Sequence, residues 1–510
     1  MSSSSHDFSF GSSSKIGKQT LFLLILLGAI HFGFGFLLNL SVDEAHYALY
    51  GLHLDWSYFD HPPMVGWIQA IPVKLDAGDG ILRLIPETLW LLTIALSMKI
   101  TAQLLQLFGR NEDYELIKSS RYWTAITLML APILHVLAVG LLPDTLLISL
   151  TSALIYTTLK IHESLRYRNR DLSLWILLGV LLGLSGLSKY TALFSALAVP
   201  ICLFTWHGKR LLGRPGLWIC LLISALLITP VIYWNYNNDW ISFIYQIKHG
   251  AGGEWKLRRV GVFLLNQLVS YGPLMLLGFW YAKKHRIFSS SIILSFFLLP
   301  FLVFSIMSGG GGSLPHWTSP AWIALAPISG AGLAYGWRNR KASTIKILSG
   351  LQFLICGVGF TLLFCGGLPW VTVDDPLGSK NPIADLYGWK DAGQEAQELS
   401  RNLQIPHLAV QNWTLGSRLA WYARPLPTYI LENRFDQFTL WFGELPKGSD
   451  AIVVNWSQMS FFPPTHPGGF SSCETIATQD VVRLGRTISS FEFFACRDWG
   501  GVNSPTRQEP

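Results

Sequence analysis

The sequence predicts a multi-pass α-helical membrane protein that ends in a small α/β domain. Half of its 510 residues are hydrophobic and only 14% are charged, and the mean hydropathy is +0.36. Soluble domains carry about 25% charged residues. A second observation is the uncharged stretch 20–40, which is long enough as a helix to cross the roughly 30 Å of hydrocarbon in a bilayer. The third is a change to polar composition after about residue 370.

Apolar stretches of this kind recur along the first 370 residues and predict about 11 spans. They are 20–40, 84–107, 122–141, 145–160, 172–188, 190–206, 216–234, 261–282, 289–307, 318–337 and 344–368. The first stretch lacks a strong basic segment before it and an A-x-A-like cleavage site after it. We therefore expect a retained span there, preceded by a disordered cytoplasmic tail over residues 1–19.

The distribution of basic residues predicts the orientation. With the N-terminus inside, the inner connections hold 19 lysines and arginines and the outer connections hold 7. Because inner loops carry the excess of basic residues in membrane proteins, the N-terminus is predicted to be cytoplasmic. An odd number of spans then places residues 370–510 outside the membrane. The formal net charge of +7 reflects this topology and gives no argument for nucleic-acid binding.

Residues 370–510 alternate between strand and helix patterns. We expect strands at HLAVQNW (407–413), TYIL (428–431) and AIVVNW (451–456), and helices over 387–403 and 414–423. This alternation is typical of a small α/β domain. Four cysteines lie in predicted spans, and only Cys473 and Cys496 fall in the outer domain. Since disulfides persist in oxidising compartments, we expect these two to pair.

The densest group of ionisable residues follows the first span directly, in SVDEAHYALYGLHLDWSYFDHPPM (41–64). It contains Asp43, Glu44, Asp60 and His61. Residues 62–75 after it are amphipathic and too short to span, so we expect a short helix along the membrane interface. We expect segments 41–80 and 234–258 to roof a cavity at the outer face.

Two further charges lie between apolar segments. Asp144 interrupts AVGLLPDTLLISL, where a carboxylate at the bilayer centre costs about 2.5–3.5 kcal/mol. It therefore needs a cavity, a partner or the interface, although a helix N-terminus after Pro143 also explains it. Lys189 in GLSGLSKYTALF either faces an internal anion or extends to the outer surface.

The later outer loops add basic residues and histidine. The loop NYNNDWISFIYQIKHGAGGEWKLRR (235–259) ends in Arg258 and Arg259, and SGGGGSLPHWTSPAW carries His316. Basic residues outside run against the positive-inside bias, which favours an anion site; aromatic residues in such loops are also ordinary interface residues. Two interpretations of the four glycines before His316 stay open. Either they let His316 approach a ligand, or they form a mobile loop. Walker, Rossmann, H-E-x-x-H and Cys-x-x-Cys motifs are absent from the sequence.

Taken together, the spaced motifs resemble a known family. They are the Asp43-Glu44 pair after the first span, the aromatic–acid–basic–Pro-Pro run at 59–63, PDTLL at 143–147, GLSKYTAL at 186–193, WNYNNDWISFIYQ at 234–246, PHWTSPAW at 315–322 and DLYGWKDAG at 385–393. This set is similar to the bacterial relatives of the dolichyl-phosphate-mannose protein mannosyltransferases. That group includes the lipid A aminoarabinose transferase and the lipopolysaccharide-core galacturonosyl transferases, all of the GT-C fold. The resemblance implies a catalytic GT-C membrane domain over residues 20–369.

The resemblance also implies a function. The donor in this family is a monosaccharide on a polyprenyl phosphate, used at the outer face of the inner (cytoplasmic) membrane. The acceptor would be an envelope glycolipid, a glycan or a protein, and direct displacement would invert the anomeric configuration. No cofactor is implied, and a metal ion is not expected.

The resemblance assigns roles to nine residues. Asp43 is the expected catalytic base, with Glu44 beside it and Asp144 as the second acidic position. The expected donor-phosphate and substrate-binding residues are Asp60, His61, Lys189, Arg258, Arg259 and His316. The aminoarabinose transferase pattern has acid–Lys before Pro-Pro, whereas this chain has Asp60-His61, like the mannosyl-type relatives. Phosphate binding through His61 is therefore expected to depend on pH.

Two other classes of protein stay open at this point. A transporter or flippase for a lipid-linked sugar would also be polytopic, but would place polar residues at the membrane midplane on discontinuous helices. A membrane-anchored binding module could use the outer domain alone. It would have no need for the acidic residues beside the first span.

Overall fold

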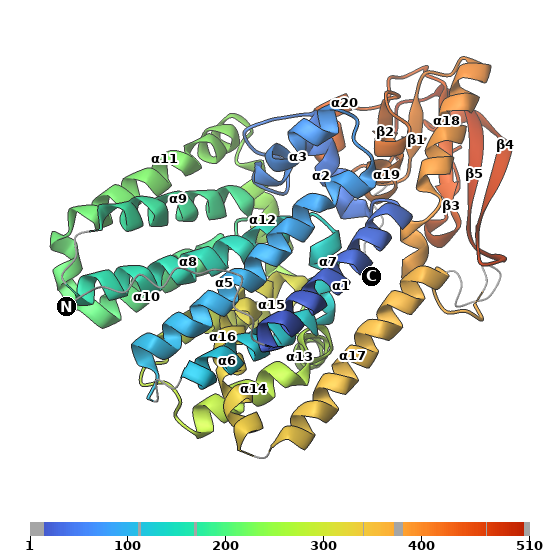
Figure 1. Cartoon of the computed structure of the whole chain (residues 1–510). Coiled ribbons are helices and arrows are strands. Elements are labelled where there is room, and N and C mark those ends of the chain that lie inside the picture. Colours follow the sequence, from blue (N-terminus) through green and yellow to red (C-terminus); the bar gives the residue numbers. More distant parts are fainter. Residues whose placement is uncertain are drawn as a thin grey trace.

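The computed structural model describes residues 15–110, 114–167, 171–339, 341–371, 381–465 and 467–503. It consists of a bundle of long helices and a small domain with a β-sheet, which is attached to one end of the bundle (Figure 1). We call this end of the bundle the domain end.

The helices of the first half of the bundle follow one another with short connections. They are α1 (Lys15–Leu37), α2 (Val42–Leu52), α3 (Met64–Lys74), α4 (Asp79–Leu82), α5 (Leu84–Phe108), α6 (Tyr114–Met129), α7 (Pro132–Val139), α8 (Pro143–Arg166), α9 (Leu172–Ser188) and α10 (Ala192–His207). The short helix expected within residues 62–75 is α3.

The second half is built in the same way. Its helices are α11 (Pro215–Asn237), α12 (Ile241–Ala251), α13 (Leu257–Tyr271), α14 (Pro273–Lys284), α15 (Ser295–Met307), the 3₁₀ turn η3 (Pro315–Thr318), α16 (Ser319–Arg338) and α17 (Ala342–Cys365). In the part of the chain that the structure describes, five helices are long and apolar enough to span a membrane, and seven do so if each bent pair counts as one. The predicted number of spans stays a prediction.

Two of the predicted spans are bent. Stretch 122–141 is divided into α6 and α7 with a 74° bend, and stretch 261–282 into α13 and α14 with a 91° bend. A proline begins the second helix of each pair, Pro132 in α7 and Pro273 in α14. Proline has no N–H for the preceding turn and restricts the residue before it, so each helix ends there. Gly272, before Pro273, adopts φ +83°, which favours glycine.

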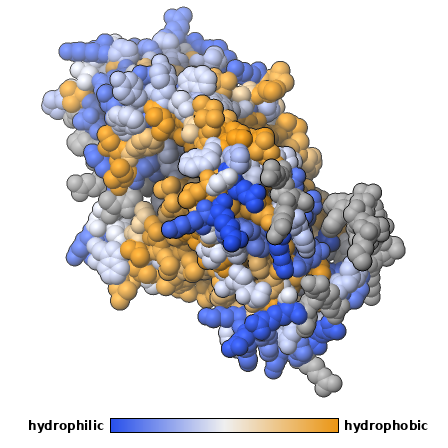
Figure 2. All heavy atoms as spheres, turned by 90° about the vertical axis from the view of Figure 1, so that its left-hand side faces the viewer, coloured by the Kyte–Doolittle hydropathy of each residue, from blue (hydrophilic) through white to orange (hydrophobic). Residues whose placement is uncertain are grey.

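The outer surface of the bundle is apolar. In the most apolar 18-residue stretch of α17, only 6% is buried inside the protein. The corresponding share is 17% in both α1 and α11. Large side chains such as Phe22, Leu222 and Phe353 are more than half exposed. On the face in Figure 2, apolar side chains cover wide areas and hydrophilic ones gather toward its upper and lower ends. Such exposed apolar surface is typical of a lipid-facing bundle, and we describe the chain as a multi-pass membrane protein.

The C-terminal domain contains a five-stranded mixed sheet in the order β2-β1-β3-β5-β4. Its elements are α18 (Trp389–Leu403), β1 (Leu408–Val410), α19 (Trp413–Tyr422), β2 (Thr428–Ile430), α20 (Gln437–Phe442), β3 (Ala451–Trp456), β4 (Phe470–Arg483) and β5 (Arg486–Trp499). The three strands and two helices expected from sequence are present. The β4–β5 hairpin and α20 were not predicted. The expected disulfide is confirmed: Cys473 and Cys496 face each other across the hairpin and are bonded.

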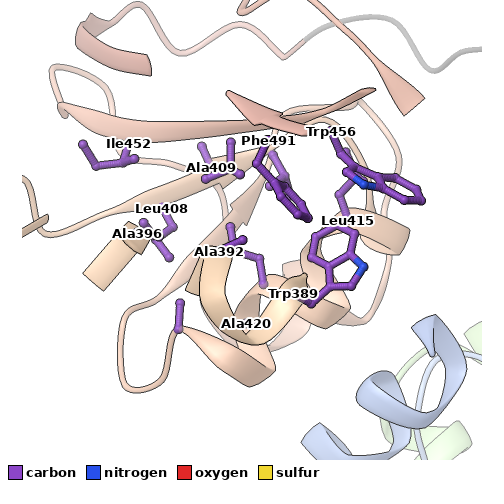
Figure 3. Close-up of a cluster of buried hydrophobic side chains, with 14 of the residues drawn as sticks. Trp389, Ala392, Ala396, Leu408, Ala409, Leu415, Ala420, Ile452, Trp456 and Phe491 are labelled. Atoms are coloured by element: carbon purple, nitrogen blue, oxygen red, sulfur yellow. The ribbon is translucent and has the colours of Figure 1, made fainter. Parts of the chain in front are cut away.

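The core of this domain extends into the helix bundle. Figure 3 shows Trp389, Trp456 and Phe491 packed with small side chains between α18, α19 and the sheet. The same hydrophobic cluster includes Ala45 and Leu49 of α2. The domain therefore packs directly on the segment that follows the first span.

Candidate functional site

The start of α2 is fixed by a network around Glu44. Ser41 and Glu44 form a capping box, in which the Ser41 backbone N–H and hydroxyl donate to Glu44 Oε2 at 3.0 and 2.9 Å. Arg83 donates to the same carboxylate through Nε at 2.7 Å and Nη2 at 2.9 Å. Both oxygens of Glu44 are thus engaged, and its side chain is only 7% exposed.

Arg83 also binds the chain where α1 ends. Its guanidinium donates to the carbonyl oxygens of Gly35, Leu38 and Asn39 at 2.6–2.9 Å. These carbonyls have no partner within α1, because the last carbonyls of a helix lack intrahelical donors. Glu44 and Arg83 together therefore set the turn from α1 into α2. Glu44, which the family resemblance placed among the catalytic residues, uses both carboxylate oxygens in this network. Its catalytic role stays a prediction.

Asp43 lies one residue before Glu44 and has different surroundings. In the part of the chain that the structure describes, no group donates a hydrogen bond to its carboxylate. Burial, reinforced by the negative charge of Asp60, raises the pKa of Asp43 to about 6. A carboxylate with a pKa close to neutrality is a suitable general base.

A second cluster of ionisable residues interacts electrostatically with Asp43 and comes from three breaks between helices. Asp144 is in the first turn of α8, Lys189 is the C-cap residue that follows α9, and His316 belongs to η3 before α16. Lys189 Nζ lies 2.5 Å from Asp144 Oδ2, and His316 Nε2 lies 3.7 Å from the same oxygen. Asp144 is 1% exposed and Lys189 5% exposed. The electrostatic interactions of Asp43 with Lys189 and Asp144 place all of these groups in one site at the domain end.

This cluster is only partly satisfied. Asp144 Oδ1 is buried and accepts no hydrogen bond from the described residues. Lys189 Nζ has Asp144 as its ion-pair partner and lies 5.7 Å from the centre of the Trp317 ring. A buried polar atom without a partner is rare in native structures and requires an explanation. Burial lowers the pKa of His316 to about 4, so this imidazole is neutral at pH 7.

Asp60 and His61 occupy the connection between α2 and α3. The Tyr50 hydroxyl donates to Asp60 Oδ1, and His46 Nε2 and His61 Nε2 lie 3.9 Å from the two Asp60 oxygens. Burial alone would raise the pKa of Asp60, but the two histidines and the Tyr50 hydroxyl outweigh it and hold the pKa below its usual value. Burial lowers the pKa of His61 to about 4, and its Nδ1 is buried without a hydrogen-bond partner among the described residues.

Arg258 and Arg259 lie at the exposed start of α13 and make no contact with this cluster among the described residues. Arg259 Nη1 donates to the carbonyl oxygens of Glu254 and Gly310 at 3.0 and 3.1 Å. It thereby fastens loop 252–256 to the glycine loop 309–312. Gly309 is required there, because a Cβ atom would lie 2.0 Å from the Trp255 indole. This packing accounts for Gly309 without a ligand, whereas a Cβ atom on Gly312 would meet no atom within 4 Å.

The C-terminal domain contributes residues that sequence reasoning did not assign to the site. Arg418 of α19 is 1% exposed, pairs with Asp385 and stacks 4.0 Å from the Trp389 ring centre. Burial lowers its pKa to about 9, while the negative charge of Asp43 acts in the opposite direction. Gln437 Oε1 accepts from the Phe59 N–H at 2.8 Å. The family motif DLYGWKDAG (385–393) contains Asp385 and Trp389 and could have pointed to them. No sequence motif marked α20, which carries Gln437.

The arrangement combines a basic carboxylate with a buried cation. The described residues contain no group of three or more histidine, cysteine or carboxylate side chains placed to hold a metal ion. Asp43 can accept a proton, and Lys189 can bind an anion. A reaction that removes a proton at one point and releases an anion at another fits this pair of groups.

The comparisons with known proteins concern the family and the fold of the chain. Residues 60–234 match the model of the dolichyl-phosphate-mannose-protein mannosyltransferase family. The chain has the GT-C fold. It superimposes on ArnT from Cupriavidus metallidurans bound to undecaprenyl phosphate with a TM-score of 0.62, over 93% of this chain and 98% of that one, at 16% identity. The apo form of the same protein gives the same TM-score and identity over 94% and 98%. The resemblance found in the motifs is confirmed.

One curated relative is more similar in sequence. The lipid A galacturonosyltransferase RgtD from Rhizobium johnstonii is 24% identical over 250 residues. The match covers 48% of this chain and 49% of RgtD, so the chain spans about half the length of the relative it matches.

Proposed function

We propose that this protein is an inverting glycosyltransferase of the inner membrane that transfers a monosaccharide from a polyprenyl phosphate to an acceptor at the outer face. The N-terminus would be cytoplasmic and the C-terminal domain extracytoplasmic. The observation that carries the proposal is the Asp43 carboxylate. Its pKa is raised to about 6, it has no hydrogen-bond donor among the described residues, and it interacts electrostatically with the Asp144–Lys189 pair.

In the proposed reaction, an acceptor hydroxyl attacks the anomeric carbon of the donor sugar. Asp43 accepts the hydroxyl proton as the new C–O bond forms. The bond from the anomeric carbon to the phosphate oxygen breaks, and its electron pair leaves with the polyprenyl phosphate. Attack opposite the leaving group inverts the anomeric configuration. Because positive charge develops on the sugar, Asp43 and the nearby Asp60 also stabilise the transition state electrostatically.

Lys189 is the proposed partner of the leaving phosphate. It is the buried cation of the cluster, and Asp144 holds its Nζ at 2.5 Å. The unpartnered Nδ1 of His61 offers a hydrogen bond to a phosphate oxygen. Because the pKa of His61 is lowered to about 4, it would act as a neutral donor, and its effect would change only below about pH 5. Arg258 and Arg259 would act at most on the approach of the lipid, from the exposed start of α13.

We take the proposed classes of donor and acceptor from the relatives. ArnT from Cupriavidus metallidurans binds undecaprenyl phosphate in its crystal structure, and RgtD is named for transfer of galacturonate to lipid A. A polyprenyl-phosphate donor and an envelope glycolipid acceptor are therefore our first choice, with glycan and protein acceptors to be tested beside it. A flippase would move the same lipid without breaking the bond to the sugar.

Purified protein in lipid nanodiscs tests the proposal. It would be incubated with synthetic polyprenyl-phosphate monosaccharides that differ at C4 and C6, and with lipid A, core oligosaccharide or peptide acceptors. We expect free polyprenyl phosphate and a glycosylated acceptor of inverted configuration by mass spectrometry and NMR. Translocation of the intact lipid-linked sugar across proteoliposomes, without cleavage, would overturn the transferase assignment.

A further inference from the structure

An open cavity of about 560 Å³ lies beside the transfer site, between the bundle and the C-terminal domain. The α2–α3 connection forms one wall, the end of α11 another, and α20 the third. Its aromatic lining comes from Trp56, Tyr233, Trp234 and Trp441. The reaction proposed above uses none of these residues.

The polar part of the lining is uncharged except for one carboxylate. Asn237, Asn238 and Gln437 present amides, and Asp55 presents the carboxylate. No lysine or arginine is among the lining residues that the structure describes. Burial lowers the pKa of His53, which keeps this imidazole neutral at pH 7. The cavity is therefore unsuited to a phosphate, in contrast to the Lys189 cluster.

The walls are held in place before any ligand arrives. Asp55 Oδ2 accepts from the Trp234 indole N–H at 2.7 Å, and the Asp55 carbonyl accepts from the Trp67 indole at 2.9 Å. The His53 ring stacks on Trp441 with centres 5.0 Å apart. Trp56 and Tyr233 remain 55% and 61% exposed, so their ring faces are available.

One aromatic layer separates this cavity from the transfer site. The Trp441 ring contacts Tyr50 edge to face, with centres 5.9 Å apart, and the Tyr50 hydroxyl donates to Asp60. Gln437 lines the cavity and also accepts the backbone N–H of Phe59, the residue before Asp60. A molecule seated in the cavity lies next to the loop that carries Asp60 and His61.

Sugar rings combine a C–H-rich face with a rim of hydroxyl groups. Such a face packs on indole and phenol rings, while amides and carboxylates fix the hydroxyls. We propose that the cavity binds a neutral, unphosphorylated saccharide unit of the acceptor and presents it to the transfer site. This inference rests on the proposed function for the meaning of the site, but binding itself is testable without the donor.

The first test measures binding alone. Saturation-transfer NMR would be recorded with the full chain in detergent and N,N′-diacetylchitobiose as the probe. We expect Trp56→Ala and Tyr233→Ala each to weaken binding about tenfold or more, since a lost stacking contact of about 1.4 kcal/mol is tenfold in affinity. Tyr236→Ala is the matched control, because Tyr236 lies on the same helix and is 69% exposed but is not among the lining residues.

The second test separates the cavity from the function. In a transfer assay, Trp56→Ala and Tyr233→Ala are expected to raise the acceptor KM about tenfold while the donor KM and the donor-only hydrolysis rate stay at the wild-type values. If transfer is active and the acceptor KM is unchanged in these variants, the proposal that the cavity binds the acceptor is contradicted, while the proposed function is not. If no transfer occurs with any donor, the proposed function fails, but the binding test still decides the proposal for the cavity. Loss of saccharide binding in Tyr233→Ala and its retention in Tyr236→Ala would support saccharide binding in the cavity. Equal saccharide binding by Tyr233→Ala and Tyr236→Ala would contradict the proposal that the cavity binds a saccharide.

Discussion

The Glu44–Arg83 pair and the Asp144–Lys189 pair are both buried at the domain end of the bundle, but they differ in how fully their polar atoms are used. Glu44 accepts from the guanidinium and from Ser41, and Arg83 donates to three further carbonyls. Lys189 has one carboxylate partner, and Asp144 leaves one oxygen without a donor among the described residues. A saturated pair holds the fold, whereas an unsaturated pair retains capacity for a ligand.

The neighbours Asp43 and Glu44 bring the same contrast to a single turn of α2. Glu44 belongs to the saturated network, and Asp43 interacts electrostatically with the unsaturated one. The family resemblance had already placed the base at Asp43, and the structure adds a physical difference between the two carboxylates.

The largest effect is expected for Asp43→Asn. The amide keeps the shape of the side chain but cannot accept the acceptor proton, and loss of a general base typically costs about 10²–10⁴-fold in rate. Donor binding should persist, because Asp43 is not the phosphate partner. Transfer assays together with equilibrium binding of a radiolabelled polyprenyl-phosphate sugar measure both quantities.

Asp43→Asn is also expected to change the thermal stability of the protein. The raised pKa of Asp43 means that the folded state binds the proton more tightly than the unfolded state. The ionised carboxylate therefore destabilises the fold above about pH 6, and this penalty disappears as the pH falls toward the ordinary pKa. Asp43→Asn should raise the thermal midpoint at pH 8 and leave it unchanged near pH 3.5. A lower midpoint at pH 8 would assign Asp43 to the structural network.

A large effect with a different signature is expected for Lys189→Met. It leaves Asp144 as a buried charge without its cation, which typically destabilises by about 3–5 kcal/mol. Adding Asp144→Asn should recover much of the thermal stability, yet transfer should stay low because the phosphate partner is still missing. Recovery of transfer in the double variant would show that Lys189 serves only the ion pair.

The pH profile distinguishes Asp43 from the histidines. Because the Asp43 pKa is about 6, kcat/KM should fall about tenfold per pH unit below 6 and stay level from pH 6.5 to 8. His61 and His316, with pKa values lowered to about 4, should add no change above pH 5. His61→Ala should retain the inflection at pH 6. A profile whose inflection moves with His61→Ala would contradict the assignment.

The smallest effect on transfer is expected for Glu44→Gln. An amide keeps one acceptor for Arg83 but removes the charge, and a buried group left unsatisfied costs about 1–3 kcal/mol. The thermal midpoint should fall, while the rate per folded molecule stays within a few-fold of wild type. Size-exclusion chromatography and single-turnover assays on the folded fraction separate the two quantities.

The sequence predicted much of this arrangement because the motifs carry short-range information. Apolar length predicted most helices within a few residues, and the strand and helix patterns predicted the central part of the C-terminal domain. The two bends were not predicted, although Pro132 and Pro273 mark them. The β4–β5 hairpin was missed because its polar alternation resembles loop composition, even though Cys473 and Cys496 were expected to pair across it.

The parts of the site that sequence could not provide depend on packing between distant segments. Arg83 lies 39 positions from Glu44, so only the fold reveals that this carboxylate is already occupied. Arg258 and Arg259 share the charge expected of a phosphate site, but their helix begins at the exposed surface. Gln437 and Trp441 reach the α2–α3 connection because the C-terminal domain docks on α2, which no local pattern specifies.

The most direct test of the central claim compares Asp43→Asn with Glu44→Gln in one single-turnover experiment. Both variants would be used at equal concentrations of folded protein, at pH 7, with the same polyprenyl-phosphate sugar and acceptor. If the unsaturated site performs the chemistry, transfer by Asp43→Asn should be at least about 100-fold slower than by Glu44→Gln, although Glu44→Gln is the less stable protein. Equal rates for the two variants, or a slower rate for Glu44→Gln, would contradict the account.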